Sequence, residues 1–129
     1  MAYFVETSII IDYLRGKQAA VDWLDGLEGD LVSSYVCLAE LYEGVYRVRN
    51  RVHAAQAVQQ FFASLQQVHG VDATIAEEFG RLRADLKEKG KIIEDMDLFV
   101  AATCLTHDLT LLTNNKKHFA RVPGLKMLP

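Results

Sequence analysis

The amino-acid sequence predicts a single α/β domain in which a short parallel sheet of four or five strands is flanked by helices. Short apolar runs alternate with longer segments that have the hydrophobic spacing of helices. The apolar runs do not alternate polar with apolar residues, as expected where helices cover both faces of a sheet. The 129 residues are enough to bury one core, so one domain is predicted over residues 1–129.

The N-terminal segment predicts a central strand followed by an acid. The run Tyr3–Val5 is the first strand, and Glu6 follows it directly. Thr7 or Ser8 is expected to cap a helix that ends near Gly16. Because Glu6 precedes these two hydroxyl residues, it is not expected to be the cap. Ligands bind at the carboxyl edge of open α/β sheets, and Glu6 falls at that edge.

The middle of the chain continues the alternation of strands and helices. Ser33 and Ser34 are expected to start one helix, and Asp72 is expected to cap a long amphipathic helix that Gly90 ends. The predicted elements are helices at about 17–27, 35–47, 52–65 and 73–89, with a short strand at 31–32 and either a third strand or an extended connection at 66–71.

The stretch 92–115 carries the most unusual pattern in the chain. Three acids, Glu94, Asp95 and Asp97, stand directly before a helix of small and apolar residues. Asp95 is expected to cap this helix, whereas Asp97 falls on the face that carries core-type residues. A carboxylate on a buried face is costly unless it is paired or binds a metal, so Asp97 is the strongest candidate for a functional acid. The predicted elements are a helix ending near His107, a strand at 109–112, a helical turn at 115–119 and an edge strand at 125–128.

Composition argues against several classes of protein. The net charge is −3 and the pI is about 5.8, which argues against coating nucleic acid by charge alone. No apolar stretch is as long as a membrane span, and the N-terminus lacks the basic region of a signal peptide. Cys37 and Cys104 sit in apolar helical patterns, which predicts two buried thiols rather than a disulfide. A cytoplasmic location is therefore expected.

The remaining motifs favour an acidic metal site. The histidines have no zinc-site spacing, and the sequence contains no phosphate-binding or dinucleotide-binding glycine motif. A site made of carboxylate and amide oxygens suits Mg²⁺ or Mn²⁺. Such ions lower the pKa of a bound water and stabilise charge on a phosphodiester, which makes hydrolysis of a phosphodiester the favoured chemistry.

Each candidate residue also has a structural alternative. Glu6 could form a salt bridge with Arg15, and Glu40 could be a solvated acid on its helix. Asn115 could shape or cap the turn after a strand. Thr113 could orient an acid through its hydroxyl group.

Three segments, in this order and spacing, resemble the PIN domain, and specifically a VapC-type toxin ribonuclease of a toxin–antitoxin pair. They are FVETSIIIDYLRG, SSYVCLAELYEG and EDMDLFVAATCLTHDLTLLTNNKKHF. The likeness covers nearly the whole chain. It implies an endoribonuclease that binds Mg²⁺ or Mn²⁺ and cleaves single-stranded or looped RNA, a cognate antitoxin protein and a homodimer.

The resemblance also assigns roles to individual residues. The implied catalytic residues are Glu6, Glu40, Asp97 and Asn115, of which the first three are metal ligands. Ser8, Thr113 and Asp95 are implied or expected to support the site, and Lys116, Lys117 and Arg121 are candidates for contact with RNA phosphates. A solvated basic turn is the alternative for these three cations.

Glu6 departs from the family pattern, because the first acid of this family is nearly always Asp. A glutamate keeps the charge but adds one methylene, which moves the carboxylate by roughly an ångström, a scale at which metal geometry matters. A PIN-like module that binds RNA or protein without cutting is therefore an alternative. A small-molecule-binding regulatory domain is a second alternative.

Overall fold

A five-stranded parallel sheet forms the centre of the molecule in the computed structural model, which describes residues 1–128. The strand order is β3-β2-β1-β4-β5, so the N-terminal strand is central, as predicted. The predicted fold class is confirmed. The strands are β1 (Ala2–Val5), β2 (Asp30–Ser34), β3 (Gln67–His69), β4 (Thr110–Leu112) and β5 (Lys126–Met127).

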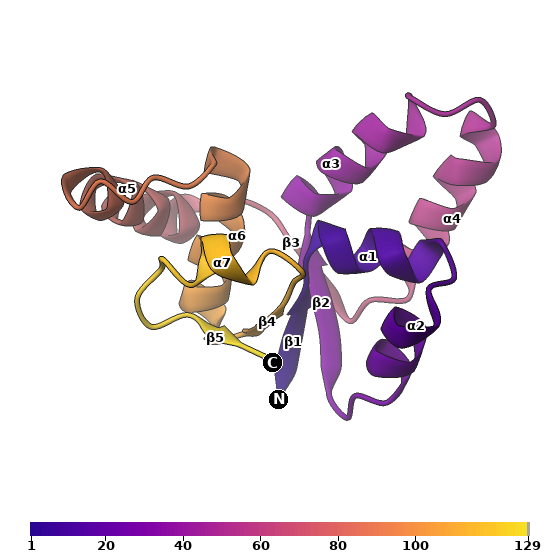
Figure 1. The fold of residues 1–129 in the computed structure, drawn as a ribbon, viewed down its shortest axis with the longest axis horizontal. Helices are drawn as coiled ribbons and strands as arrows, with labels where there is room; N and C mark the ends of the chain where they lie inside the picture. The colour runs from indigo at the N-terminus through magenta and orange to yellow at the C-terminus, as the bar shows by residue number, and fades with distance from the viewer. Residues whose placement is uncertain (129) are drawn as a thin grey trace.

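Seven helices cover the two faces of the sheet within the described part of the chain. In Figure 1, the first four helices lie on one side of the sheet and the last three lie on the other. None of the helices in residues 1–128 is both long enough and apolar enough to cross a membrane. The helices are α1 (Thr7–Leu14), α2 (Gln18–Asp25), α3 (Tyr35–Val45), α4 (Arg51–Ala63), α5 (Ala73–Glu88), α6 (Asp95–His107) and α7 (Lys116–Phe119).

The topology creates a switch point beside β1. The chain passes from β1 to β2 and β3 on one side, and then crosses to β4 and β5 on the other side. Tyr3 is in register with Leu31 of β2 and with Thr110 of β4. The backbone N–H of Glu6 donates to the carbonyl oxygen of Leu112 at 3.0 Å, which extends the β1–β4 pairing to the carboxyl edge. Ligands of open α/β sheets bind at such an edge.

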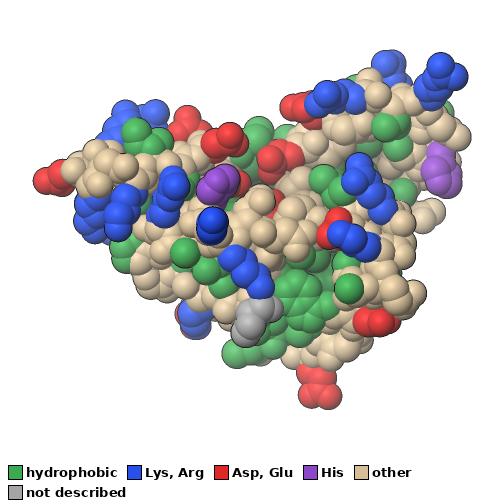
Figure 2. Space-filling view, in the orientation of Figure 1, with side chains coloured by type: hydrophobic (Ala, Val, Ile, Leu, Met, Phe, Trp, Pro, Cys, Tyr) green, Lys and Arg blue, Asp and Glu red, His purple; other side chains and the backbone are tan. Residues whose placement is uncertain are grey.

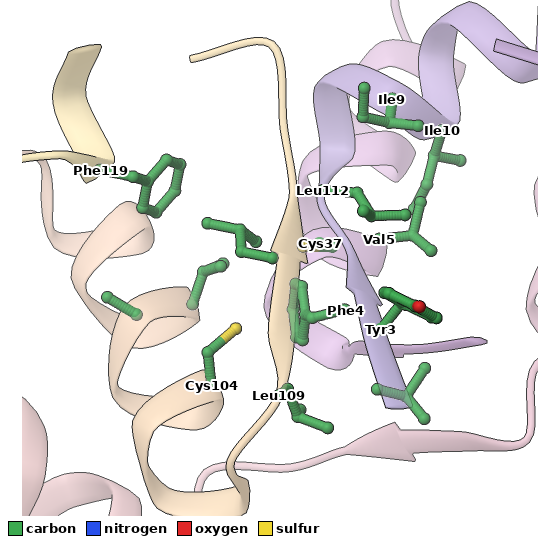
Figure 3. Packing of buried hydrophobic residues seen from close by; sticks show 14 of the residues in the cluster. Tyr3, Phe4, Val5, Ile9, Ile10, Cys37, Cys104, Leu109, Leu112 and Phe119 are labelled. Atoms are coloured by element: carbon green, nitrogen blue, oxygen red, sulfur yellow. The ribbon is translucent and has the colours of Figure 1, made fainter. Parts of the chain in front are cut away.

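Large apolar side chains on the strands and small residues on α6 form the core between the sheet and this helix. Phe4 and Leu111 are fully buried, and the small residues of α6 let that helix pack against the strands. In Figure 3, Phe119 and Cys104 approach the strands from one side, while Ile9 lies on α1 on the other.

Both cysteines are buried and free, as the sequence predicts. Burial raises the pKa of the Cys37 thiol to about 11 and the pKa of Cys104 well above its usual value. Neither thiol is therefore available as a nucleophile at neutral pH.

Two of the predicted helix caps are present. The Ser34 hydroxyl oxygen accepts from the N–H of Cys37 at 3.4 Å, and the Asp72 carboxylate accepts from the N–H of Ile75 at 2.9 Å. Ser33 is a strand residue, and its hydroxyl donates to the Val5 carbonyl oxygen at 2.9 Å. The predicted helix at 17–27 is shorter than expected, because it ends at Asp25, before the two glycines that precede β2.

We predict opposite effects for two glycine-to-alanine substitutions. Gly29 has a φ of +142°, and a Cβ there would lie 2.5 Å from the Met1 carbonyl oxygen. Gly29→Ala should therefore lower the free energy of unfolding by about 2 kcal/mol or more. Gly80 lies inside α5 with open space around it, so Gly80→Ala should raise the free energy of unfolding by about 0.5–1 kcal/mol. Urea denaturation measures both, and equal effects would contradict the assigned backbone conformation.

Candidate active site

Three of the predicted acids come together at the carboxyl edge of the sheet from three different elements. Glu6 follows β1, Glu40 lies on α3, and Asp97 lies in the first turn of α6. Burial, together with the negative charges of Glu6 and Glu40, raises the pKa of Asp97 to about 6. In Figure 2, acidic side chains lie in the notch between the half of the molecule that contains α3 and the half that contains α5 and α6.

Glu6 is held by a set of short hydrogen bonds. Its side chain is buried, and one carboxylate oxygen accepts from the hydroxyl groups of both Ser8 and Thr113, each at 2.5 Å. The other oxygen accepts from the backbone N–H of Ser8 at 3.2 Å. The partners of the Glu6 carboxylate are therefore Ser8 and Thr113, and not Arg15 as in the salt-bridge alternative.

The prediction that Glu6 is not a cap was wrong. Glu6 is the N-cap residue of α1, and Thr7 is the first residue of the helix. Capping rules favour short side chains, because these reach the free N–H groups most directly. Here the longer glutamate side chain reaches the N–H of Ser8, two residues along the chain.

Thr113 and Ser8 join two loops around Glu6. Thr113 is buried, and its hydroxyl oxygen also accepts from the backbone N–H of Asn115 at 2.9 Å. The backbone N–H of Asn114 donates to the Ser8 hydroxyl at 3.0 Å. The turn between β1 and α1 is thereby connected to the loop between β4 and α7, more than 100 residues away in the sequence.

Glu40 is half-buried and is held by Thr7, which sequence reasoning treated only as a possible cap. The Thr7 hydroxyl donates to one oxygen of Glu40 at 2.8 Å. Burial raises the pKa of Glu40; this hydrogen bond opposes the rise, whereas the charges of Glu6 and Glu94 add to it. The sequence did contain a signal for this contact. Thr7 and Ser8 are adjacent hydroxyl residues after a strand, and two such residues can donate hydrogen bonds to two different acids.

The prediction that Asp95 caps α6 was also wrong. The helix begins at Asp95 itself, Glu94 occupies the N-cap position, and the Glu94 side chain makes no capping hydrogen bond. Asp95 is exposed and accepts from Arg83 at 3.0 Å, so α5 holds it away from the other acids. Glu94 is exposed as expected, but its charge raises the pKa of Asp97 and of Glu40. Sequence reasoning therefore missed Glu94 as a member of the acidic cluster.

Comparison with known proteins places the chain in a family. The PIN domain family model matches residues 3–125. The chain belongs to the PIN domain family, among its VapC-type toxin ribonucleases. It is 31% identical to ribonuclease VapC1 of Methanocaldococcus jannaschii, over 95% of this chain and 84% of that protein.

Two further similarities support the family assignment. The chain is 30% identical to the tRNA(fMet)-specific endonuclease VapC of Shigella flexneri, over 98% of this chain and 96% of that protein. The structure matches VapBC2 from Rickettsia felis, which was solved bound to a DNA fragment from its promoter. That match has a TM-score of 0.91 and 28% identity, and it covers 99% of this chain and 98% of the other.

The remaining predicted site residues of this PIN domain lie around α7. Asn115 is exposed at the N-cap position of α7, but its side chain makes no capping hydrogen bond, contrary to the capping alternative. Lys116 and Lys117 are exposed on the same short helix. Arg121 donates to the carbonyl oxygen of Ile92 at 2.8 Å, which connects the end of α7 to the segment before α6.

The donors of the acidic cluster fit a divalent metal ion in their chemistry. Carboxylate, amide and hydroxyl oxygens are ligands that Mg²⁺ and Mn²⁺ accept. The raised pKa of Asp97 shows that burial and like charge act against its carboxylate, and a bound cation would relieve both. In the described residues, no three side chains of Asp, Glu, His or Cys are arranged to hold an ion as they stand. Glu6 and Glu40 instead accept hydrogen bonds from Ser8, Thr113 and Thr7.

We predict that Asp97→Asn stabilises the metal-free PIN domain at neutral pH. Folding raises the pKa of Asp97 from 3.8 to about 6, so the folded protein binds this proton more tightly than the unfolded chain. The wild type therefore loses stability as the pH rises from about 4 through 6, and the neutral Asn avoids that loss. The gain at pH 7.5 should be about 1–2 kcal/mol, which is less than the full pKa shift implies because the site is partly solvated.

Urea denaturation in EDTA at pH 4.5 and at pH 7.5 measures this effect. The gain should shrink at the lower pH, where the wild-type carboxyl group is largely protonated when folded. Asp95→Asn is the matched control, because Asp95 is exposed and paired with Arg83. A gain for Asp97→Asn that is the same at both pH values would contradict the assigned pKa.

Proposed function

We propose that this VapC-type chain is a metal-dependent endoribonuclease toxin, whose single domain uses Glu6, Glu40 and Asp97 to bind Mg²⁺ or Mn²⁺. The observation that carries the proposal is the meeting of these three carboxylates at the switch point of the sheet, where Asp97 has a pKa of about 6. Family membership supplies the reaction class, which is hydrolysis of RNA phosphodiester bonds. The chain would act in the cytoplasm, where its RNA substrate is found.

A bound divalent ion would activate water and stabilise the charge that develops on the phosphodiester. The residues of this chain prepare the site for that chemistry. Ser8 and Thr113 fix the orientation of Glu6, and Thr7 fixes that of Glu40. Asp97 is the carboxylate that most needs a cation, because its side chain has no hydrogen-bond donor of its own within the described residues. The exposed Asn115 side chain would support the metal or orient the water.

Glu6 stands where the family usually has an aspartate, and its carboxylate still has a fixed orientation. Three hydrogen bonds from Ser8 and Thr113 hold the longer side chain, so its extra rotatable bond does not leave the carboxylate free. Hydrogen bonds to a charged group are worth about 1.5–3 kcal/mol each. This support favours an active enzyme over a module that only binds RNA or protein.

A cognate antitoxin protein is the proposed partner. An apolar groove of about 270 Å³ lies between α1, α3 and α4 and reaches Glu40. An antitoxin segment in this groove would cover Glu40 at the edge of the acidic cluster, and several of the solved structures that resemble this chain are toxin–antitoxin complexes. We also expect a homodimer, because several large apolar side chains are exposed. These include Tyr46, Val48 and Val52 on the α3–α4 half of the molecule.

We predict that Asp97→Ala reduces metal-dependent RNA cleavage at least about 100-fold. Without this ligand the metal ion would bind poorly, so it could neither activate water nor stabilise the negative charge that develops on the phosphodiester. Asp95→Ala is the matched control, since it removes a carboxylate two residues away that is exposed and paired with Arg83. It should leave cleavage within about 3-fold of the wild type. The measurement is cleavage of a transfer RNA mixture and of unstructured RNA with Mn²⁺ or Mg²⁺; undiminished cleavage by Asp97→Ala would sink the assignment.

We predict that Mn²⁺ raises the melting temperature of the wild type and does so more strongly at pH 7.5 than at pH 5.5. A ligand at about 100 times its dissociation constant stabilises a protein by about 2.7 kcal/mol, which corresponds to several degrees for a domain of this size. At pH 5.5 a proton on Asp97 competes with the ion, because its pKa is about 6. Asp97→Asn should lose most of the shift. A shift of equal size in wild type and variant would show that the ion binds elsewhere.

A further inference from the structure

Three surface hollows lie in series across α7. The first, of about 450 Å³, lies between α1–α2 and the loop after β4. The second, of about 330 Å³, lies over residues 114–118, and the third, of about 580 Å³, lies between α7 and the segment before α6. Asn114 and Lys116 line both the first and the second hollow, and Lys117 lines both the second and the third. Together they form one continuous surface, called here the α7 track.

Positive charge is concentrated along the α7 track. Lys17 and Lys116 line its first hollow, and Lys91, Lys117 and Arg121 line its third. In Figure 2, Lys and Arg side chains gather over α7 and its surroundings. The whole chain has a net charge of −3, so overall composition does not explain this concentration.

Few carboxylates compensate these cations. Within residues 1–128, Lys91, Lys116, Lys117 and Arg121 form no salt bridge. Asp12 is the one acid that lines any of the three hollows in the described chain. Its carboxylate is already engaged, since it pairs with Lys17 at 3.6 Å and accepts from the side-chain amide of Asn114 at 2.9 Å.

An aromatic side chain stands at one end of the track. Trp23, the single tryptophan of the chain, is partly exposed and lines the first hollow beside Asn114. Proteins that bind single-stranded nucleic acid combine cations that follow the backbone with aromatic rings on which bases stack. Double-stranded RNA is recognised mainly by shape and backbone contacts, which make no use of an aromatic pocket.

We propose that the α7 track binds single-stranded RNA, with a base stacked on Trp23 and with phosphates contacted by Lys91, Lys117 and Arg121. The proposal rests on the proposed nuclease function, because it concerns how the substrate lies beside the acids. Thr113 connects the two sites: it lines the first hollow, and its hydroxyl donates to Glu6. RNA that occupies the track therefore passes the loop that positions the first acid. Trp23 and Lys91 thereby become substrate-contact residues that lie outside the acidic cluster.

Binding is tested separately from cleavage by using the Asp97→Asn variant in EDTA. The probe is a short unstructured RNA, and the readout is the fluorescence of Trp23, which needs no label because the chain contains one tryptophan. RNA should quench this fluorescence saturably, and the affinity should fall as salt rises. Adding Lys117→Glu should weaken binding about 10-fold and flatten the salt dependence. Arg49→Glu makes the same charge change at an exposed residue between α3 and α4 and should change the affinity less than 2-fold.

The stacking contact is tested by anisotropy with end-labelled RNA. Trp23→Leu should weaken binding about 10-fold with little change in salt dependence, whereas Trp23→Phe should stay within about 3-fold of the parent. Circular dichroism establishes that each variant is folded. Equal affinities for Lys117→Glu and Arg49→Glu, or RNA binding that leaves Trp23 fluorescence unchanged, would overturn the track.

Different experimental results would contradict the proposed α7 track and the proposed nuclease function. Wild-type protein that cleaves RNA with Mn²⁺, together with an unchanged KM for Lys117→Glu and Trp23→Leu, would overturn the track and leave the nuclease function standing. Wild-type protein that binds RNA on the track but cleaves none would overturn the nuclease function and leave the track standing. Wild-type protein that neither binds nor cleaves RNA would overturn both.

Discussion

Repulsion among carboxylates at the carboxyl edge of the sheet is the constraint on which the rest of this structure depends. Asp97 is buried in the first turn of α6, near Glu6, Glu40 and Glu94, and its pKa rises to about 6. The N-terminal end of a helix favours an anion, but this effect is smaller than the combined cost of burial and like charge. The fold thus carries a local cost that a bound cation would remove. Such a cost is typical of sites that are shaped for a ligand rather than for stability.

The hydroxyl groups around the acids show how the fold controls this repulsion. Ser8 and Thr113 donate hydrogen bonds to Glu6, while Thr7 donates one to Glu40, so two of the three charges are partly compensated without an ion. The consecutive residues Thr7 and Ser8 serve different acids because they point to different sides at the start of α1. One short turn therefore fixes two acids, and the loop after β4 closes the arrangement through Thr113.

The sequence was sufficient for the parts of this site that follow local rules. The place of Asp97 in the acidic cluster could be predicted because an acid on an apolar helical face is costly, and that of Glu6 because it follows a central strand. The pairing of Thr7 with Glu40 could not be predicted, since it joins residues 33 positions apart and depends on how α1 packs against α3. The two wrong capping predictions share one cause. Propensity rules rank residue types, but they do not include the tertiary partners that Glu6 and Asp95 have here, namely Thr113 and Arg83.

The separation of charge on one surface suggests how a chain with a net charge of −3 can accept RNA. Phosphates are repelled by the acidic cluster, so a substrate held by the acids alone would bind poorly. Cations along α7 supply attraction next to the cluster, and Thr113 belongs to both regions. In the proposed arrangement a strand would be held by the cations, and the phosphodiester to be cut would approach the acids once a bound cation neutralises their charge. Our proposal thus assigns binding and cleavage to adjacent groups of opposite charge, and a divalent ion at the acids would decide whether bound RNA is also a substrate.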